Sequence, residues 1–396
     1  MVDRLANSAW WVRVLAVYAA TRALTFLLFL ITAATQGDNY WTKANPSYFD
    51  FLNIWDVEWY GKIYDHGYPI ILPLSDTGAV QQNEWAFMPG FPTTVRAFDF
   101  LGLEWKFAAP ILATIFGACF ALVAFRIFAA KLSDHQSLWA VGLFLLSPAS
   151  PVLQTGYAES LGLLLLALAI YAWLSDRFAL AIGAMLALAF TRPGLAALAL
   201  AFAVVWVYRF VQARMGNRGF PIFEAVRLGA LTAIALVLNF AWPLIAALVT
   251  GRPDAYVATE LAWRAGYPFD GGGLAPILPW FSSAEYFVGG IAGQVLVIAA
   301  LVGAVVIFFI PQVRAMGLEL GAISAAYFVY LLLFFFPQSS IVRILMPTFV
   351  LYGALAQGWV RWPRSLRYLG LAILVILQLA WLLTCWRYAA PDFSPP

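Results

Sequence analysis

Charged residues are scarce in this chain, and their scarcity excludes most soluble folds. Only 11% of the 396 residues are charged, whereas a soluble domain has about 25%. Hydrophobic residues make up 63%, and the mean hydropathy is +0.82. The formal net charge is only +3, which gives no reason to expect a nucleic-acid partner. The composition therefore predicts an integral membrane protein.

Cysteine and histidine are also rare, with two residues of each. Cys119 and Cys385 both lie in apolar runs, which argues against a disulfide framework or a cysteine metal site. His66 and His135 fall on opposite sides of the expected membrane, so neither supports a histidine metal site or a Ser/His/Asp triad. We expect no metal and no cofactor.

Apolar runs that are long enough for membrane helices recur along the whole chain. A spanning helix needs roughly 20 mainly apolar residues, and on that basis we expect about eleven spans. The expected spans are residues 12–34, 107–130, 137–151, 157–174, 177–191, 194–211, 226–249, 287–310, 316–336, 341–359 and 366–386. Those between 137 and 191 are short, so tilted, broken or re-entrant helices are alternatives there. We expect the first span to be a retained helix rather than a signal peptide.

The basic residues set the orientation, because cytoplasmic loops carry an excess of Lys and Arg. With a cytoplasmic N-terminus, the inside loops hold most of them, including the basic stretch 209–227 and the trio Arg361, Arg364 and Arg367. Most acids, Asp270 among them, then lie outside. The pattern predicts a multi-pass plasma-membrane protein whose active site, if it has one, faces outward.

Two of the outer segments are long, at residues 35–105 and 250–286. They are rich in aromatic residues, proline and glycine, which argues against disorder. We expect them to fold into short amphipathic helices on the outer leaflet. The expected fold class is therefore an all-α polytopic membrane protein, with residues 1–396 forming a single membrane-embedded domain.

An aromatic and acidic cluster lies in the first outer segment: Trp55-Asp56-Val57-Glu58-Trp59-Tyr60. The flanking tryptophans should partly desolvate the Asp56 carboxylate, which raises its proton affinity and suits a general base. An aromatic belt with incidental acids is the alternative, because Trp and Tyr concentrate at membrane interfaces. Asp56 and Glu58 could also bind a divalent cation, but a lone carboxylate pair is more typical of a solvated surface.

A proline-rich break, Ser147-Pro148-Ala149-Ser150-Pro151, interrupts the third span, and Tyr157 and Glu159 open the fourth. An acid in the first turn favours the positive end of a helix, so Glu159 can be a capping residue. Its position on an irregular outer loop equally suits hydrogen bonds to sugar hydroxyls. Tyr157 and Glu159 are therefore both candidate substrate-binding residues.

Several arginines on the expected outer side run against the orientation bias: Arg192, Arg252, Arg264 and Arg343. Arginine binds phosphate bidentately and is always charged, so we expect Arg192 and Arg343 to bind a phosphate. Arg264 and its neighbour Trp263 are further candidate substrate contacts. Anchoring to lipid headgroups is the alternative.

Arg22 lies deep within the first expected span, with about ten apolar residues on either side. An ionisable group at that depth should face the interior of the helix bundle. We expect it to meet an acid, a backbone carbonyl or a bound anion.

Short motifs in a fixed order carry a family resemblance. The motifs are Trp55-Asp56-x-x-Trp59-Tyr60 with Gly67-Tyr68, Ala86-Phe87-Met88-Pro89-Gly90-Phe91-Pro92, Ser147-Pro148, Tyr157-Ala158-Glu159-Ser160, Thr191-Arg192-Pro193, Pro337-Gln338-Ser339-Ser340 with Arg343 and Pro347, and a Trp-rich C-terminus that ends on Pro395-Pro396. In these motifs the chain resembles the PIG-V-type integral-membrane mannosyltransferases, specifically their actinobacterial relatives, of the GT-C glycosyltransferase superfamily. Val57, Met88 and Gly90 depart from the family pattern, which leaves the acceptor more open than the reaction type.

The resemblance implies a GT-C fold and the inverting transfer of mannose from polyprenyl-phosphate mannose. The acceptor would be a hydroxyl of a glycolipid, lipoglycan or glycoprotein at the outer face, among membrane lipids. The resemblance maps the catalytic acid of the first outer loop onto Asp56. Arg192 or Arg343 would stabilise the leaving phosphate, which removes the need for a metal. Glu58, Tyr60, Tyr157 and Glu159 would line the substrate site with Trp263 and Arg264.

Two other classes of function fit some of these features. A transporter or flippase of a lipid-linked saccharide would also use outer acids and intramembrane arginine, but it predicts broken helices in paired halves and functional charge on both faces. Here the long polar segments lie on one face only. A non-catalytic scaffold of a glycolipid-assembly complex predicts that Asp56 can be lost without effect.

Overall fold

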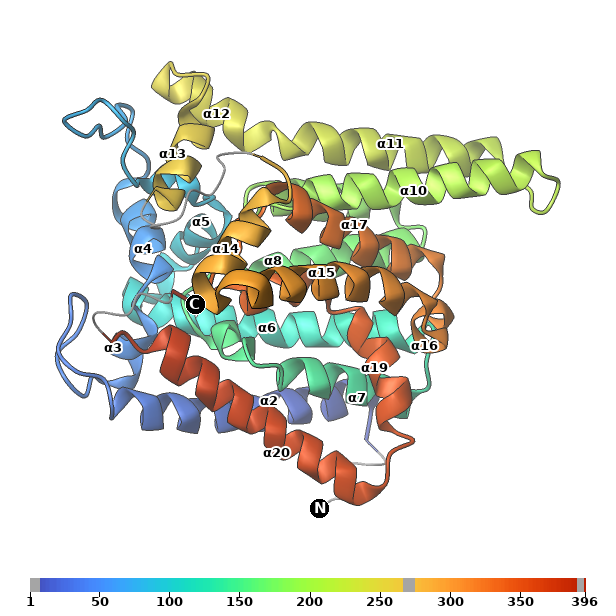
Figure 1. Ribbon diagram of the computed structural model, residues 1–396, viewed down its shortest axis with the longest axis horizontal. Coiled ribbons are helices and arrows are strands. Elements are labelled where there is room, and N and C mark those ends of the chain that lie inside the picture. Colours follow the sequence, from blue (N-terminus) through green and yellow to red (C-terminus); the bar gives the residue numbers. More distant parts are fainter. Residues whose placement is uncertain (1–7, 266–274, 390–394) are drawn as a thin grey trace. The chain divides into compact units, whose positions relative to one another are not determined.

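Helices make up nearly all the regular structure of this protein (Figure 1). The computed structural model describes residues 8–265, 275–389 and 395–396. Within them no strand is formed, and a single isolated antiparallel bridge joins Leu74 and Val80. The expectation of an all-α fold is confirmed for this part of the chain. Asp270 and residues 266–274 of the second outer segment lie outside the described residues.

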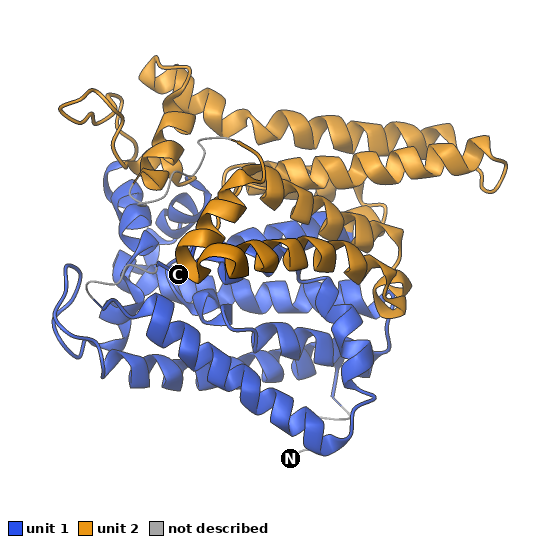
Figure 2. Ribbon diagram, viewed as in Figure 1, with its two compact units in different colours: residues 1–66, 89–171, 338–396 blue, residues 67–88, 172–337 orange. Residues whose placement is uncertain are grey.

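The chain divides into two compact units, coloured separately in Figure 2. Unit 1 consists of residues 1–66, 89–171 and 338–396, and unit 2 of residues 67–88 and 172–337. Each unit therefore combines segments that are far apart in the sequence, and both take part of the first outer segment. The expectation of a single membrane-embedded domain stays a prediction.

Six helical stretches among the described residues are long and apolar enough to cross a membrane. They are α2 (Trp10–Ala33), α6 (Trp105–Ala129), α10 (Leu195–Arg214), α11 with α12 (Ile222–Asn239 and Ala241–Thr250), α15 with η4 (Gly290–Val306 and Ile307–Phe309) and α20 with η6 (Arg364–Trp381 and Leu382–Trp386). Each coincides with one of the expected spans. A seventh arises if the pair Ile341–Thr348 and Leu351–Trp359, bent by 85°, is counted as one span.

The other expected spans correspond to shorter or bent helices. These are α7 (Asp134–Leu145), α8 (Glu159–Leu174), α9 (Phe178–Ala189), α17 (Leu318–Phe334), and the series α18 (Ile341–Ile344), η5 (Met346–Thr348) and α19 (Leu351–Trp359). Helices α7 and α9 have 12 residues each. At about 1.5 Å per residue they reach about 18 Å, against a hydrocarbon core of about 30 Å. A count of eleven full spans therefore stays a prediction.

The two segments that the sequence places outside, residues 35–105 and 250–286, contain short helices. The first holds α3 (Tyr48–Leu52), α4 (Asp56–His66), η1 (Glu84–Ala86), α5 (Gly90–Arg96) and η2 (Asp99–Leu101). The second holds α13 (Ala255–Arg264) and most of α14 (Leu278–Val288), and α16 (Pro311–Ala315) follows later in the chain. Their placement on an outer leaflet stays a prediction.

Buried Arg22 stabilises the break between the end of α7 and the start of η3 (Ser150–Gln154). Its guanidinium donates to the carbonyl of Ser150 at 2.6 Å and to that of Leu145 at 2.8 Å. The side-chain amide of Gln378 donates to the Ser150 hydroxyl at 2.8 Å. Carbonyls at a helix end lack intrahelical partners, so these donors satisfy groups that burial would otherwise penalise. Arg22 is buried, and of the three expected kinds of partner, an acid, a backbone carbonyl or a bound anion, it meets backbone carbonyls.

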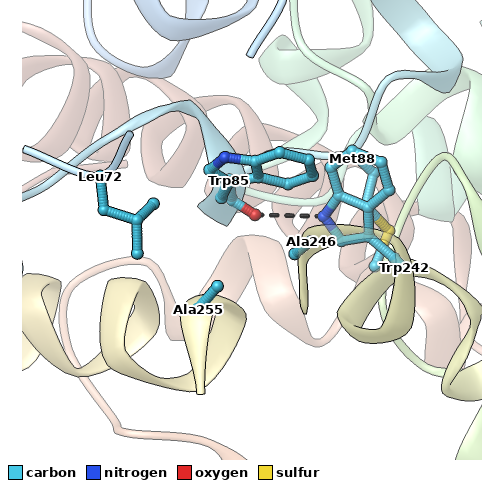
Figure 3. Packing of buried hydrophobic residues seen from close by; sticks show 6 residues of the cluster. All are labelled: Leu72, Trp85, Met88, Trp242, Ala246 and Ala255. Atoms are coloured by element: carbon cyan, nitrogen blue, oxygen red, sulfur yellow. Dashed lines mark hydrogen bonds between the residues drawn. The ribbon is translucent and has the colours of Figure 1, made fainter. Parts of the chain in front are cut away.

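In unit 2, an aromatic cluster fixes the segment 67–88 (Figure 3). The buried residues of this cluster are Leu72, Trp85, Met88, Trp242, Ala246 and Ala255. The Trp242 indole N–H donates to the Trp85 carbonyl at 3.1 Å (Figure 3). The ring of Tyr68 packs on both tryptophans. Met88, one of the departures from the family pattern, is thus a core residue that is 7% exposed.

Candidate active site

Asp56 begins α4 directly after a residue in an uncommon conformation. Trp55 has a φ of 62°, in the left-handed region that bulky residues rarely adopt. Such a conformation costs on the order of 1–3 kcal/mol and persists only where the surroundings hold it. The buried Trp55 indole donates to the carbonyl of Trp386 at 2.6 Å, and its ring packs 4.9 Å from that of Trp41. Tertiary contacts therefore set the direction in which the chain enters α4.

Arg343 joins two carboxylates within unit 1. Its Nη1 donates to Oδ2 of Asp56 at 3.2 Å and to Oε1 of Glu159 at 2.6 Å. The side chains of Arg343 and Glu159 are 8% and 4% exposed, whereas that of Asp56 is 23% exposed. Two negative groups and one positive group leave a net charge of −1 in this cluster. Asp56 is thus its most accessible member, next to a buried ion pair.

Tyr157 completes the cluster. Its hydroxyl accepts a hydrogen bond from the Asp56 backbone N–H at 3.2 Å, and the guanidinium carbon of Arg343 lies 5.0 Å from its ring centre. The Tyr157 side chain is fully buried, at 0% exposed. The preceding Gly156 allows this approach, because a Cβ there would lie 2.7 Å from Cγ1 of Val57.

Glu58 has different partners from Asp56. Its carboxylate accepts from the Trp41 indole at 2.7 Å and lies 2.8 Å from Nζ of Lys62. Residues two apart on a helix do not face each other, which explains the separation. Among the described residues, no group of three or more His, Cys, Asp and Glu side chains could hold a metal ion. Tyr60, also a candidate, is 2% exposed and packs against Phe91.

The remaining candidate residues, Arg192, Trp263 and Arg264, lie in unit 2. So does the carboxylate of Glu260, which the sequence motifs did not single out. Glu260 of α13 interacts with Arg192 and Arg264, and it forms a hydrogen bond with Tyr256. Burial raises the pKa of Glu260, although Tyr256 and the two arginines oppose the shift. The spacing of four residues from Tyr256 to Glu260 and from Glu260 to Arg264 was the signal in the sequence, because it aligns the three on one helix face.

Trp263 and Arg264 each have a defined setting in unit 2. The ring of Trp263 packs 5.6 Å from that of Phe87, and Nη2 of Arg264 donates to the Phe334 carbonyl at 2.9 Å. Arg343 belongs to unit 1 and Arg192 to unit 2. That these two bind one phosphate therefore stays a prediction.

Trp386 and Tyr388, near the C-terminus, contact residues around Asp56, and the sequence analysis did not single them out. Trp386 donates from its indole N–H to the Phe51 carbonyl at 2.9 Å, and its ring lies 5.5 Å from that of Tyr157. Tyr388 packs on Trp41 and Trp55. The only signal in the sequence was the richness of this segment in tryptophan.

The described residues thus define a class: a helical protein with several helices long and apolar enough to cross a membrane, in which Arg343 bridges the carboxylates of Asp56 and Glu159. The sequence matches no protein-family model and no curated protein. Among solved structures, it is similar in fold to the archaeal oligosaccharyltransferase AglB from Archaeoglobus fulgidus, in complex with an inhibitory peptide and a dolichol-phosphate. The TM-score is 0.51 at 12% identity, over 97% of this chain and 56% of that chain.

The apo form of the Archaeoglobus fulgidus oligosaccharyltransferase gives a similar result. Its TM-score is 0.50 at 13% identity, over 95% of this chain and 57% of that chain. This chain therefore spans a little over half the length of these structures. At 12% and 13% identity, the similarity shows a shared fold and no more. The PIG-V type and the actinobacterial relationship stay predictions.

Proposed function

We propose that this chain is a GT-C glycosyltransferase that moves mannose from polyprenyl-phosphate mannose to a hydroxyl acceptor, with inversion, at the outer face of the membrane. The observation that carries the proposal is the partly exposed Asp56 carboxylate held by Arg343. The fold supports it, because the similar AglB structure contains a dolichol-phosphate and a peptide. Mannose and the polyprenyl carrier rest on the family resemblance.

Asp56 is the general base in this proposal. One of its carboxylate oxygens takes the proton of the acceptor hydroxyl as the hydroxyl oxygen bonds to the anomeric carbon. The bond from that carbon to the phosphate oxygen breaks, and polyprenyl phosphate leaves with the electron pair. A single displacement of this kind inverts the anomeric configuration. General-base catalysis contributes about 10²–10⁴-fold to such a rate.

Arg343 and Glu159 prepare Asp56 for this role. A base must be ionised before it can accept a proton, and a cation at 3.2 Å stabilises the ionised carboxylate. Glu159 contacts the same guanidinium nitrogen at 2.6 Å and so helps to fix its position. Glu159 is thus more than a helix cap, and the proposal assigns it to holding Arg343.

The departing phosphate needs its own cation. Arg192 and Arg264 both interact electrostatically with Glu260. With Glu260 ionised, these three groups carry a net charge of +1. A guanidinium stabilises negative charge that develops on a phosphate oxygen. From the family resemblance we assign the donor phosphate to Arg192 or Arg343, the two arginines that the sequence predicts to bind it.

The deciding experiment is a transfer assay with the purified full-length protein in detergent. Polyprenyl-phosphate mannose with a labelled sugar is incubated with lipid acceptors extracted from membranes, and polyprenyl-phosphate glucose serves as the matched donor. We expect label to move from the mannosyl donor to an acceptor, with the anomeric configuration inverted by NMR. Label that crosses a vesicle membrane while still attached to its carrier would instead indicate a flippase. Absence of transfer to any acceptor would overturn the proposed reaction.

A further inference from the structure

The end of the last long helix lies against the loop that carries Asp56. In Figure 1 this end of α20 approaches α3, and Trp386 donates to the α3 residue Phe51. Residues Leu382–Trp386 form a π-helical turn, closed by a hydrogen bond from the Arg387 N–H to the Leu382 carbonyl at 2.8 Å. We call residues 386–388 the C-terminal strap. The strap and Asp56 both belong to unit 1.

Trp386 contacts two residues that are bonded to the Asp56 backbone: Trp55, which precedes it in the chain, and Tyr157, which accepts its N–H. Its carbonyl accepts from the indole of Trp55, the residue before Asp56, at 2.6 Å. Its ring packs against Tyr157, whose hydroxyl accepts from the Asp56 N–H. Carbonyls at a helix C-terminus have no intrahelical partner, which leaves the Trp386 carbonyl available to Trp55. π-Turns of this kind often occur at functional sites.

The strap is held at its other end by Gln36, which is 2% exposed. The Gln36 side chain donates to the Tyr388 carbonyl at 2.9 Å and accepts from the Tyr388 N–H at 3.0 Å. The ring of Tyr388 packs on Trp55 at 5.8 Å. The strap is therefore held on both sides of Arg387, and two of its residues, Trp386 and Tyr388, contact Trp55.

We propose that the C-terminal strap is a positioning element of the active site, in which the Trp386 carbonyl holds Trp55 in the left-handed conformation that directs Asp56 toward Arg343. This inference rests on the proposed transferase function. A tryptophan at positive φ needs such support, because without it the residue returns to negative φ. The first turn of α4 would then reorient and carry Asp56 with it. A displacement of about 1 Å at a reacting group lowers the rate on the order of 10²-fold.

Two variants of the full-length protein test the strap through turnover. Trp55→Phe keeps an aromatic ring but loses the N–H that Trp386 accepts, and Gln36→Ala removes the clamp on Tyr388. Trp11→Phe, at a surface position that is 50% exposed, is the matched control. With polyprenyl-phosphate mannose as donor, we expect kcat per folded molecule to fall about 10- to 100-fold in the first two variants, with the donor KM within about twofold. The control should match the wild type.

A second measurement does not depend on catalysis. Cys385 precedes Trp386, so its rate of maleimide labelling in a Cys119→Ser background reports on the strap. We expect labelling to accelerate several-fold in Trp55→Phe and Gln36→Ala, but not in Trp11→Phe. If the wild type is active but both kcat and the labelling rate are unchanged in Trp55→Phe and Gln36→Ala, the positioning role of the strap is overturned and the proposed function is not. A wild-type protein that transfers nothing from this donor overturns the proposed function, and the positioning role with it.

Discussion

Nη1 of Arg343 lies 3.2 Å from Oδ2 of Asp56, although 287 residues separate them in the sequence. The same nitrogen is 2.6 Å from Oε1 of Glu159, which comes from a third segment of unit 1. A buried cation shared by two acids is expensive to assemble unless its geometry is well satisfied. The cluster therefore gives the clearest targets for mutation.

Asp56→Asn should abolish sugar transfer, because an amide of the same shape cannot accept the acceptor proton. We expect the rate to fall about 10²–10⁴-fold while the thermal stability stays near that of the wild type. Asp65→Asn, at an exposed acid on the same helix, is the control and should keep full activity. Transfer by Asp56→Asn within a few-fold of wild type would remove Asp56 from the base role and would favour a scaffold.

Arg343→Gln should damage both stability and activity, because it removes the cation beside a Glu159 carboxylate that is 4% exposed. Breaking a buried ion pair at one side costs about 3–5 kcal/mol. The charge-balanced double variant Glu159→Gln/Arg343→Gln should recover much of that stability but not the activity. Arg343→Lys should lie between, since it keeps the charge but loses the planar fork. Thermal unfolding and transfer assays check this, and a single variant as stable as the wild type would contradict it.

Arg192→Gln should weaken donor binding if Arg192 holds the donor phosphate. A hydrogen bond to a charged group contributes about 1.5–3 kcal/mol, so we expect the donor KM to rise about tenfold or more. Arg192→Lys should raise it less. Arg252→Gln is the matched control, because Arg252 is fully paired with Asp254 at the surface. Equal donor KM values in all variants would move the phosphate site elsewhere, first to Arg264.

Transfer should survive treatment with EDTA. Asp56 and Glu58, the acids that could have shared a cation, have separate partners in Arg343 and Lys62. A guanidinium can stabilise the leaving phosphate in place of a metal. Activity is measured before and after chelation and dialysis. Loss of activity that manganese or magnesium restores would show a metal requirement and overturn this mechanism.

Glu260→Gln should stabilise the protein increasingly as the pH rises. Burial raises the pKa of Glu260 in the folded state, so ionisation opposes folding. This penalty is absent below the unfolded pKa of about 4.3 and is complete above the raised folded pKa. The melting temperature of the variant relative to the wild type should therefore increase across that window and then level off. A difference that does not depend on pH would mean that Glu260 does not titrate there.

Among the described residues, the apolar runs were enough to predict the six helical stretches that are long and apolar enough to cross a membrane. A run such as Leu195–Arg214 is helical and apolar whatever it packs against, because a backbone in lipid must satisfy its own hydrogen bonds. The break after Leu145 was equally predictable, since prolines cannot supply helix N–H donors. The local sequence also predicted that Asp56 lies beyond the first apolar helix, which ends at Ala33.

What the sequence by itself determined was thus local: where helices form, where they break, and which acids and arginines stand outside the apolar runs. Only the tertiary structure decided that Arg343 meets Asp56 and Glu159, that Arg22 meets carbonyls, and that Trp386 supports Trp55. Each of these contacts joins residues far apart in the sequence, and no periodic pattern in the sequence predicts such pairs. The left-handed φ of Trp55 shows the reason, because a conformation unfavourable in isolation becomes stable only when distant residues hold it.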